Sequence, residues 1–152
     1  MSFSRKKQQT SFFRKSIGVT LCWVICLSVP SHDEYRRSQI RELLDRAEEM
    51  LNADPSKAIY YSSQAITEAQ KVGDTGGSTM GQAILGEAYM SLGDFNIGFE
   101  ILTHAMEVCP PDSLHLKACI FLHLSGAYLK LKDLHKAFMY VDKAADIYRA
   151  QN

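Results

Sequence analysis

From Ser38 onward, apolar residues recur at intervals of three and four, the spacing that places them on one side of an α-helix. Prolines, glycines and aspartates divide this pattern into segments of helical length. No stretch alternates between apolar and polar residues as a half-buried strand does. The sequence therefore predicts an all-α protein with helices at 35–52, 55–72, 78–92, 95–109, 112–131 and 134–151.

The helical pattern repeats along the chain. Three aspartates, Asp54, Asp94 and Asp133, are separated by 40 and 39 residues. Two sets of small residues keep the same spacings: Ala58, Gly98 and Ala137, and Ala65, Ala105 and Ala144. A regular period of this length indicates that each repeat is one pair of helices and that the pairs stack.

The repeated residues resemble the tetratricopeptide repeat (TPR) family at the positions that define its hairpin. In the second repeat these are Leu85, Gly86, Tyr89, Leu92, Gly93, Asp94, Phe95, Gly98, Leu102, Ala105 and Pro110. In the third they are Leu124, Ser125, Tyr128, Leu131, Asp133, Leu134, Ala137, Val141 and Ala144. The first repeat is a weaker copy, shifted by one residue in its turn: Leu51, Asp54, Pro55, Ala58, Ser62 and Ala65.

The resemblance implies a right-handed alpha-alpha superhelix, a TPR-like solenoid of about three helical hairpins. The domain is expected to span 32–152, with units at about 38–74, 79–112 and 118–152. Small residues are expected where the two helices of a hairpin meet, so Gly86 should face Gly98, and Ser125 should face Ala137.

The connections between helices are also predicted. Asp94 and Asp133 lie in turns, where an aspartate accepts hydrogen bonds from free helical N–H groups. Pro110 and Pro111 end one helix, because proline cannot continue its hydrogen-bond pattern, and Asp112 or Ser113 caps the next. The glycine-rich segment 73–77 is predicted to be a loop.

The resemblance further implies a concave surface lined by the first helix of each hairpin. The matching residues are Met80, Ala83, Glu87, Met90, Cys119, Leu122, Gly126 and Leu129. Most are apolar, and methionine adapts to partners of varied shape. Two interpretations stay open: an apolar groove that binds a protein or peptide, or packing against neighbouring helices within the chain.

Residues 1–31 have the pattern of a targeting segment. Five basic residues and no acidic ones precede an apolar run at 17–29, which has 13 residues. A membrane-spanning helix needs about 20 residues, so this length favours a cleaved signal peptide with a cut after Ser31. An uncleaved membrane anchor and a lipoprotein modified at Cys26 are the alternatives. We therefore expect an exported protein, periplasmic or extracellular, with membrane contact only through this segment if it is uncleaved.

The charge distribution argues against nucleic acid as the main partner. The chain holds 17 basic and 17 acidic residues, so the 121 residues after the basic segment carry 12 basic and 17 acidic ones. Nucleic-acid phosphates bind to basic surfaces, and a domain with more acidic than basic residues is poorly suited to them.

No catalytic or cofactor-binding arrangement stands out, so the sequence predicts a non-enzyme. His115, Cys119 and His123 lie on one side of a helix, but His115 and His123 are about 12 Å apart along it, too far for one tetrahedral metal ion. We expect these three side chains to face solvent or the groove. Cys109 and Cys119 are expected to remain unbridged, because helical geometry separates their Cα atoms by about 10 Å or more.

Two functions follow as hypotheses. The first is an exported scaffold that binds a protein or peptide partner through the concave groove. The second is an N-terminal sensory module of a membrane-bound bacterial signal-transduction regulator, which the exported repeat array also resembles. The last predicted helix is amphipathic, and it lacks the polar capping element that normally covers the end of a solenoid. Three explanations stay open: a truncated product, a fragment of a longer protein, or a terminus that meets a partner.

Overall fold

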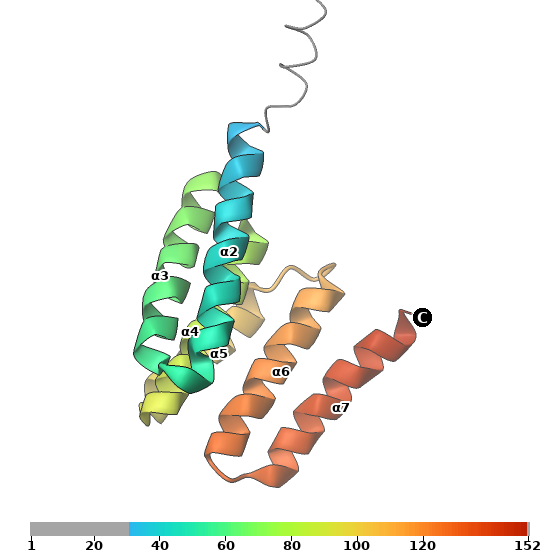
Figure 1. The fold of residues 1–152 in the computed structure, drawn as a ribbon. Coiled ribbons are helices and arrows are strands. Elements are labelled where there is room, and N and C mark those ends of the chain that lie inside the picture. The colour runs from blue at the N-terminus through green and yellow to red at the C-terminus, as the bar shows by residue number, and fades with distance from the viewer. Residues whose placement is uncertain (1–30, 152) are drawn as a thin grey trace, which may run out of the picture. The chain divides into compact units, whose positions relative to one another are not determined.

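The computed structural model describes residues 31–151, and the structural statements below concern that part of the chain. Contacts divide the chain into Met1–Tyr35 and Arg36–Asn152. Six helices follow one another, with no strand among the described residues (Figure 1): α2 (His32–Ala53), α3 (Pro55–Val72), α4 (Thr75–Leu92), α5 (Phe95–Val108), α6 (Leu114–Lys130) and α7 (Leu134–Ala150). The all-α prediction is confirmed, and the helix bounds agree with the predicted ones to within three residues.

The glycine-rich segment 73–77 is mostly helical, which corrects the predicted loop. Gly73 takes a left-handed conformation (φ 69°) and ends α3, and α4 already begins at Thr75. The Asp74 carboxylate accepts a hydrogen bond of 2.9 Å from the Gly77 backbone N–H. This cap stabilises the first turn of α4, so two glycines can be accommodated inside the helix.

Aspartates cap three of the helices. The carboxylates of Asp54, Asp74 and Asp133 each accept from the backbone N–H three residues later, at 3.2, 2.9 and 3.1 Å. The prediction is confirmed at Asp133 and wrong at Asp94, which occupies the N-cap position of α5 without a side-chain hydrogen bond. Asp94 is exposed, so water can satisfy the free N–H groups there. Ser113, the N-cap residue of α6, likewise makes no capping bond.

Two glycines allow α4 and α5 to approach closely, as predicted. A Cβ atom on Gly98 would lie 2.7 Å from the Gly86 carbonyl oxygen, and a Cβ atom on Gly86 would lie 2.9 Å from the Gly98 carbonyl oxygen. Neither position has room for a methyl group without movement of the backbone.

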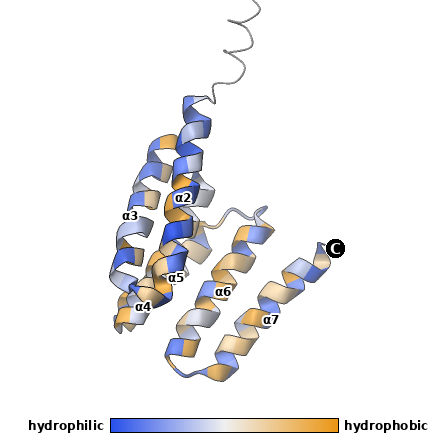
Figure 2. Cartoon of the chain, viewed as in Figure 1, coloured by the Kyte–Doolittle hydropathy of each residue, from blue (hydrophilic) through white to orange (hydrophobic). Residues whose placement is uncertain are grey.

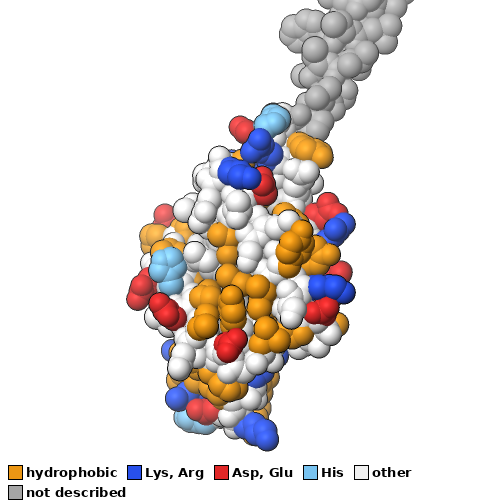
Figure 3. Space-filling model, turned by 90° about the vertical axis from the view of Figure 1, so that its left-hand side faces the viewer, with side chains coloured by type: hydrophobic (Ala, Val, Ile, Leu, Met, Phe, Trp, Pro, Cys, Tyr) orange, Lys and Arg blue, Asp and Glu red, His pale blue; other side chains and the backbone are white. Residues whose placement is uncertain are grey.

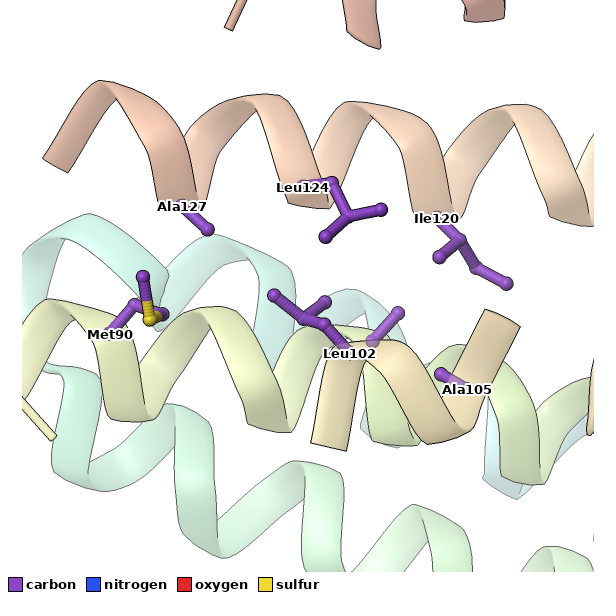
Figure 4. Close-up of a cluster of buried hydrophobic side chains, with 7 residues drawn as sticks. Met90, Leu102, Ala105, Ile120, Leu124 and Ala127 are labelled. Atoms are coloured by element: carbon purple, nitrogen blue, oxygen red, sulfur yellow. The ribbon is translucent and has the colours of Figure 1, made fainter. Parts of the chain in front are cut away.

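The core consists of two clusters that each join one hairpin to the next. The first contains Ala47, Leu51, Ala58, Ile84 and Ala88, from α2, α3 and α4. The second joins α4 and α5 to α6 (Figure 4), and its buried members are Ala83, Met90, Leu102, Ala105, Ile120, Leu124 and Ala127. Each hairpin therefore covers an apolar side of the one before it.

The spacing between equivalent residues of the first and second hairpins changes by one at the turn, because the turn of the first hairpin is one residue shorter. Asp54 alone connects α2 to α3, whereas Gly93 and Asp94 connect α4 to α5. Residues of α3 therefore correspond to residues of α5 at a spacing of 40, while residues of α2 correspond to those of α4 at 39. Ala47, Gly86 and Ser125 are equivalent in this alignment, and all three are buried.

No helix within 31–151 combines the length and apolar character that crossing a membrane requires. The apolar run at 17–29, and with it the predicted signal peptide, lies outside the described residues.

Candidate functional site

The predicted groove residues of α4 are largely covered. Ala83 and Met90 are 0% and 1% exposed, and both belong to the cluster that receives α6. Met80 is partly buried and packs against the first cluster. The prediction that Ala83 and Met90 line an open groove is therefore wrong. The alternative, packing within the chain, holds at these two residues, because α6 occupies the place that a partner would take.

The predicted groove residues of α6 behave differently. Leu122 and Leu129 are 45% and 52% exposed, although they correspond to Ala83 and Met90 one repeat earlier. Cys119 and Gly126 are partly buried. The eight predicted residues thus do not form one continuous surface, and the exposed apolar ones belong to the last hairpin.

Glu87 and Gly126, both predicted to line the groove, lie together at a polar contact between α4 and α6. The Glu87 carboxylate occupies the space that a Cβ atom at Gly126 would need. His123 Nδ1–H donates to Glu87 Oε2 at 2.8 Å, and both side chains are nearly buried. Glu48 Oε1 on α2 lies 3.9 Å from His123 Nε2. The imidazole therefore joins α6 to α4, and Glu48 of α2 lies close to its other nitrogen.

The burial of His123 corrects the expectation that it faces solvent or the groove. The residue is 9% exposed, and its imidazole points toward Glu87. A buried carboxylate is costly unless a donor pairs with it, and His123 supplies that donor. No sequence motif indicates this pair, because its members are 36 residues apart.

Cys119 lies between two other side chains on the last hairpin. Its Sγ atom is 3.8 Å from His115 Nε2 and 3.9 Å from the hydroxyl oxygen of Tyr148 on α7. Burial raises the pKa of the Cys119 thiol, the Tyr148 hydroxyl lowers it by hydrogen bonding, and the Glu48 carboxylate raises it. A thiol of this kind is a poor nucleophile, since the thiolate is the reactive form.

The described residues contain no group of three or more His, Cys, Asp or Glu side chains placed to hold a metal ion. Cys109 and Cys119 are both free thiols, as predicted from the helix geometry.

Four of the exposed apolar side chains of the last hairpin are equivalent to residues that pack together in the preceding hairpin. They are Leu122 and Leu129 on α6, together with Phe138 and Val141 on α7, which are 67% and 40% exposed. We call these four residues the terminal apolar face. In the repeat alignment they correspond to Ala83, Met90, Phe99 and Leu102, which α6 covers in the preceding hairpin.

A second surface feature was not predicted. A groove between α3, α4 and α5 is lined by Ile66, Leu85, Phe99 and Ile101, with Gln82, Glu100, Thr103, His104 and Glu107 beside them. Figure 3 looks onto the side on which α3 lies in Figure 1 and shows hydrophobic side chains gathered along its middle, with charged ones near the edges. None of the eight predicted site residues lines this groove.

The fold and these surfaces define an all-helical protein of stacked helical pairs. Comparison with known proteins adds nothing to this description: no protein-family model, no curated protein and no solved structure matches the chain at a significant level.

Proposed function

We propose that this chain is a TPR-like repeat scaffold that binds a protein or peptide partner. The three helical pairs, their repeat spacing and the close glycine contact of α4 with α5 support the TPR-like, right-handed superhelical arrangement. The observation that carries the binding function is the terminal apolar face, in which four large side chains are 40–67% exposed. Contiguous exposed apolar side chains usually mark a binding surface.

The proposal is tested by selecting peptides from a displayed random library on the purified domain. Leu122→Ser combined with Leu129→Ser should abolish binding of the selected peptides. Because both side chains are exposed, the double substitution should change stability by no more than about 0.5 kcal/mol per site. Leu92→Ser combined with Ile97→Ser is the matched control, since these side chains are 49% and 46% exposed elsewhere on the molecule.

Selected peptides that bind the double variant and the wild type equally would assign binding to another surface. A selection that enriches no peptide at all would contradict the scaffold function itself. Met90 is not a suitable position for this test, because it is buried and its truncation would cost about 2–5 kcal/mol as for other core residues.

We also propose that the protein is exported through its basic and apolar N-terminal segment. Support comes from the 13-residue apolar run after five basic residues, and from the start of α2 at His32, so that a cut after Ser31 leaves every described helix whole. N-terminal sequencing of the secreted protein should give a chain that begins near His32. A secreted chain that begins at Met1 would contradict cleavage.

A further inference from the structure

The internal repeat shows what covers the equivalent of the terminal apolar face in the preceding hairpin. There, Ala83, Met90 and Leu102 are buried against one side of α6, and Phe99 packs at the edge of the same cluster. The side chains that α6 inserts are Ile120, Leu124 and Ala127 (Figure 4). These occupy positions i, i+4 and i+7 and so form one stripe along the helix.

The same interface occurs one repeat earlier with a related set of residues. The positions of α4 that correspond to Ile120, Leu124 and Ala127 are Gly81, Leu85 and Ala88. Ala88 is buried in the first cluster, and a Cβ atom on Gly81 would lie 2.7 Å from Ile66 Cγ1 on α3. Ile84 lies between Gly81 and Ala88 in this earlier interface, whereas Leu85 lines the groove between α3, α4 and α5. Both successive interfaces are therefore made by an incoming helix with an apolar stripe that ends in a buried alanine.

The first helix cannot supply such a stripe to a second copy of the chain. At the corresponding positions α2 carries Glu42, Arg46 and Glu49, all of them exposed. Glu42 and Arg46 form an ion pair of 2.6 Å. Figure 2 shows that α2 is mostly hydrophilic, whereas α6 is largely apolar. Head-to-tail stacking of two copies would bury these charges against leucine and phenylalanine, which is costly.

We propose that the terminal apolar face binds an amphipathic helix of a partner protein that carries apolar residues at i, i+4 and i+7, with a small residue at the last of these positions. This inference rests on the proposed scaffold function and specifies its ligand. The helix lies against α6 and α7 as α6 lies against α4 and α5, continuing an interface that the molecule already contains twice. Extended peptides lack this stripe and do not fit the face in the same way.

The probe is a synthetic peptide with the sequence of α6, Leu114–Lys130, with blocked termini. It carries Cys119→Ser to prevent crosslinking, and Leu122→Lys and Leu129→Lys so that only the inserting side is apolar. It should bind the intact chain in a fluorescence titration and gain helical circular dichroism on binding. The same peptide with Leu124→Asp is the control ligand and should bind at least about tenfold more weakly.

On the protein side, Leu129→Ser combined with Phe138→Ser removes one exposed residue from each helix of the face. This variant should bind the peptide at least about tenfold more weakly, while Leu92→Ser combined with Ile97→Ser binds it as the wild type does. Equal binding by all three proteins, or no binding by any of them, overturns the proposal.

Two further outcomes would also overturn it. A concentration-dependent dimer, seen in sedimentation and lost in the Leu129→Ser, Phe138→Ser variant, would assign the face to a second copy of the chain. Library peptides that bind this face without a helical stripe, together with failure of the helical probe, would remove the inference and leave the scaffold function standing.

Discussion

Gly98 packs tightly against both a side chain and a backbone. A methyl group there would lie 2.6 Å from Met90 Cγ and 2.7 Å from the Gly86 carbonyl oxygen, so both a side chain and a backbone would have to move. We expect Gly98→Ala to destabilise the protein by about 1–3 kcal/mol, as overpacked core sites do. Urea denaturation of the variant and the wild type measures this difference.

Gly76→Ala is the matched control for that measurement. Gly76 is also helical, but the nearest atom to its added methyl group, Asp74 Oδ1, is 3.5 Å away. Alanine favours a helix over glycine by about 1 kcal/mol, so this variant should be as stable as the wild type or more stable. Equal changes in stability at both glycines would contradict the role assigned to the α4–α5 contact at Gly98.

The two thiols provide a pH-dependent prediction. Burial raises the pKa of both Cys109 and Cys119 in the folded protein. A raised pKa favours the neutral thiol, so its stabilising contribution is complete below the unfolded value of about 8.5 and is lost as the pH rises toward the folded pKa. The free energy of unfolding should therefore be lower at about pH 9.5 than at about pH 7.5.

Replacing both cysteines by serine should make that pH-dependent loss smaller. In the folded wild type at about pH 8, a disulfide reagent such as DTNB should also modify both thiols more slowly than in urea, where they ionise normally. Rates in the folded protein that equal those in urea would contradict the burial of the thiols.

Burial of individual side chains was only partly predictable from the sequence. The meeting of Gly86 and Gly98 follows from residue size and repeat spacing alone, so the sequence was sufficient there. The different environments of Met90 and Leu129 do not follow, because equivalent positions carry the same kind of residue and differ only in whether another hairpin covers them. The His123–Glu87 pair depends on the contact of α4 with α6, which no local pattern reveals.

At the scale of single elements, the turns of the second and third hairpins show the same geometry with different residues. Gly93 (φ 92°) ends α4, and its equivalent, Lys132 (φ 60°), follows α6 in the same left-handed region. In both turns the next aspartate N–H bonds to a tyrosine carbonyl oxygen at 3.0 Å: Asp94 to Tyr89, and Asp133 to Tyr128. Lysine is strained in this conformation, whereas glycine is not.

Lys132→Gly should therefore stabilise the protein by up to about 1 kcal/mol, because it relieves the left-handed strain at the cost of more backbone freedom in the unfolded chain. The reverse change, Gly93→Lys, should destabilise it by about 1–2 kcal/mol. Thermal or urea unfolding of the two variants provides the comparison, and a loss of stability in Lys132→Gly would contradict this account of the turn.

The existence and order of the helices were predictable because proline, aspartate and apolar spacing mark them locally. The start of α4 was not, because its first turn contains Gly76 and Gly77, and glycine ordinarily indicates a loop. The cap at Asp74 decides the outcome there. The same reasoning predicted a cap at Asp94. There the carboxylate makes no hydrogen bond to the first turn of α5, and water can reach the free N–H groups instead.

At the scale of the whole molecule, the helices differ strongly in how much of their surface is covered. The buried residues of α4 number seven, and this helix contacts α3, α5 and α6. In α7 the buried residues are Ala137 and Ala144, and the helix packs against α6. Stability in stacked repeats depends on neighbouring units, so a helix at the end of the stack opens at lower free energy.

We therefore expect backbone amides of α7 to exchange with deuterium faster than those of α4 under native conditions. Mass spectrometry of peptic peptides from the two helices measures this directly. Addition of the α6-derived peptide should slow exchange in α7 if it binds the terminal apolar face. Identical protection in α4 and α7 without the peptide would mean that the domain opens only as a single cooperative unit.

The outer side of α2 is charged, whereas the exposed side of the last hairpin is apolar. Further hairpins can therefore be added at one end of the array only. A tandem duplication of the segment 114–150, joined through a copy of the 109–113 connection, would bring a ready-made Ile120–Leu124–Ala127 stripe to a surface that already accepts it. An extra hairpin placed before α2 would instead meet the Glu42–Arg46 ion pair. Both evolution and protein engineering can therefore add a hairpin after α7 by duplication. A hairpin added before α2 would have to bury charged side chains.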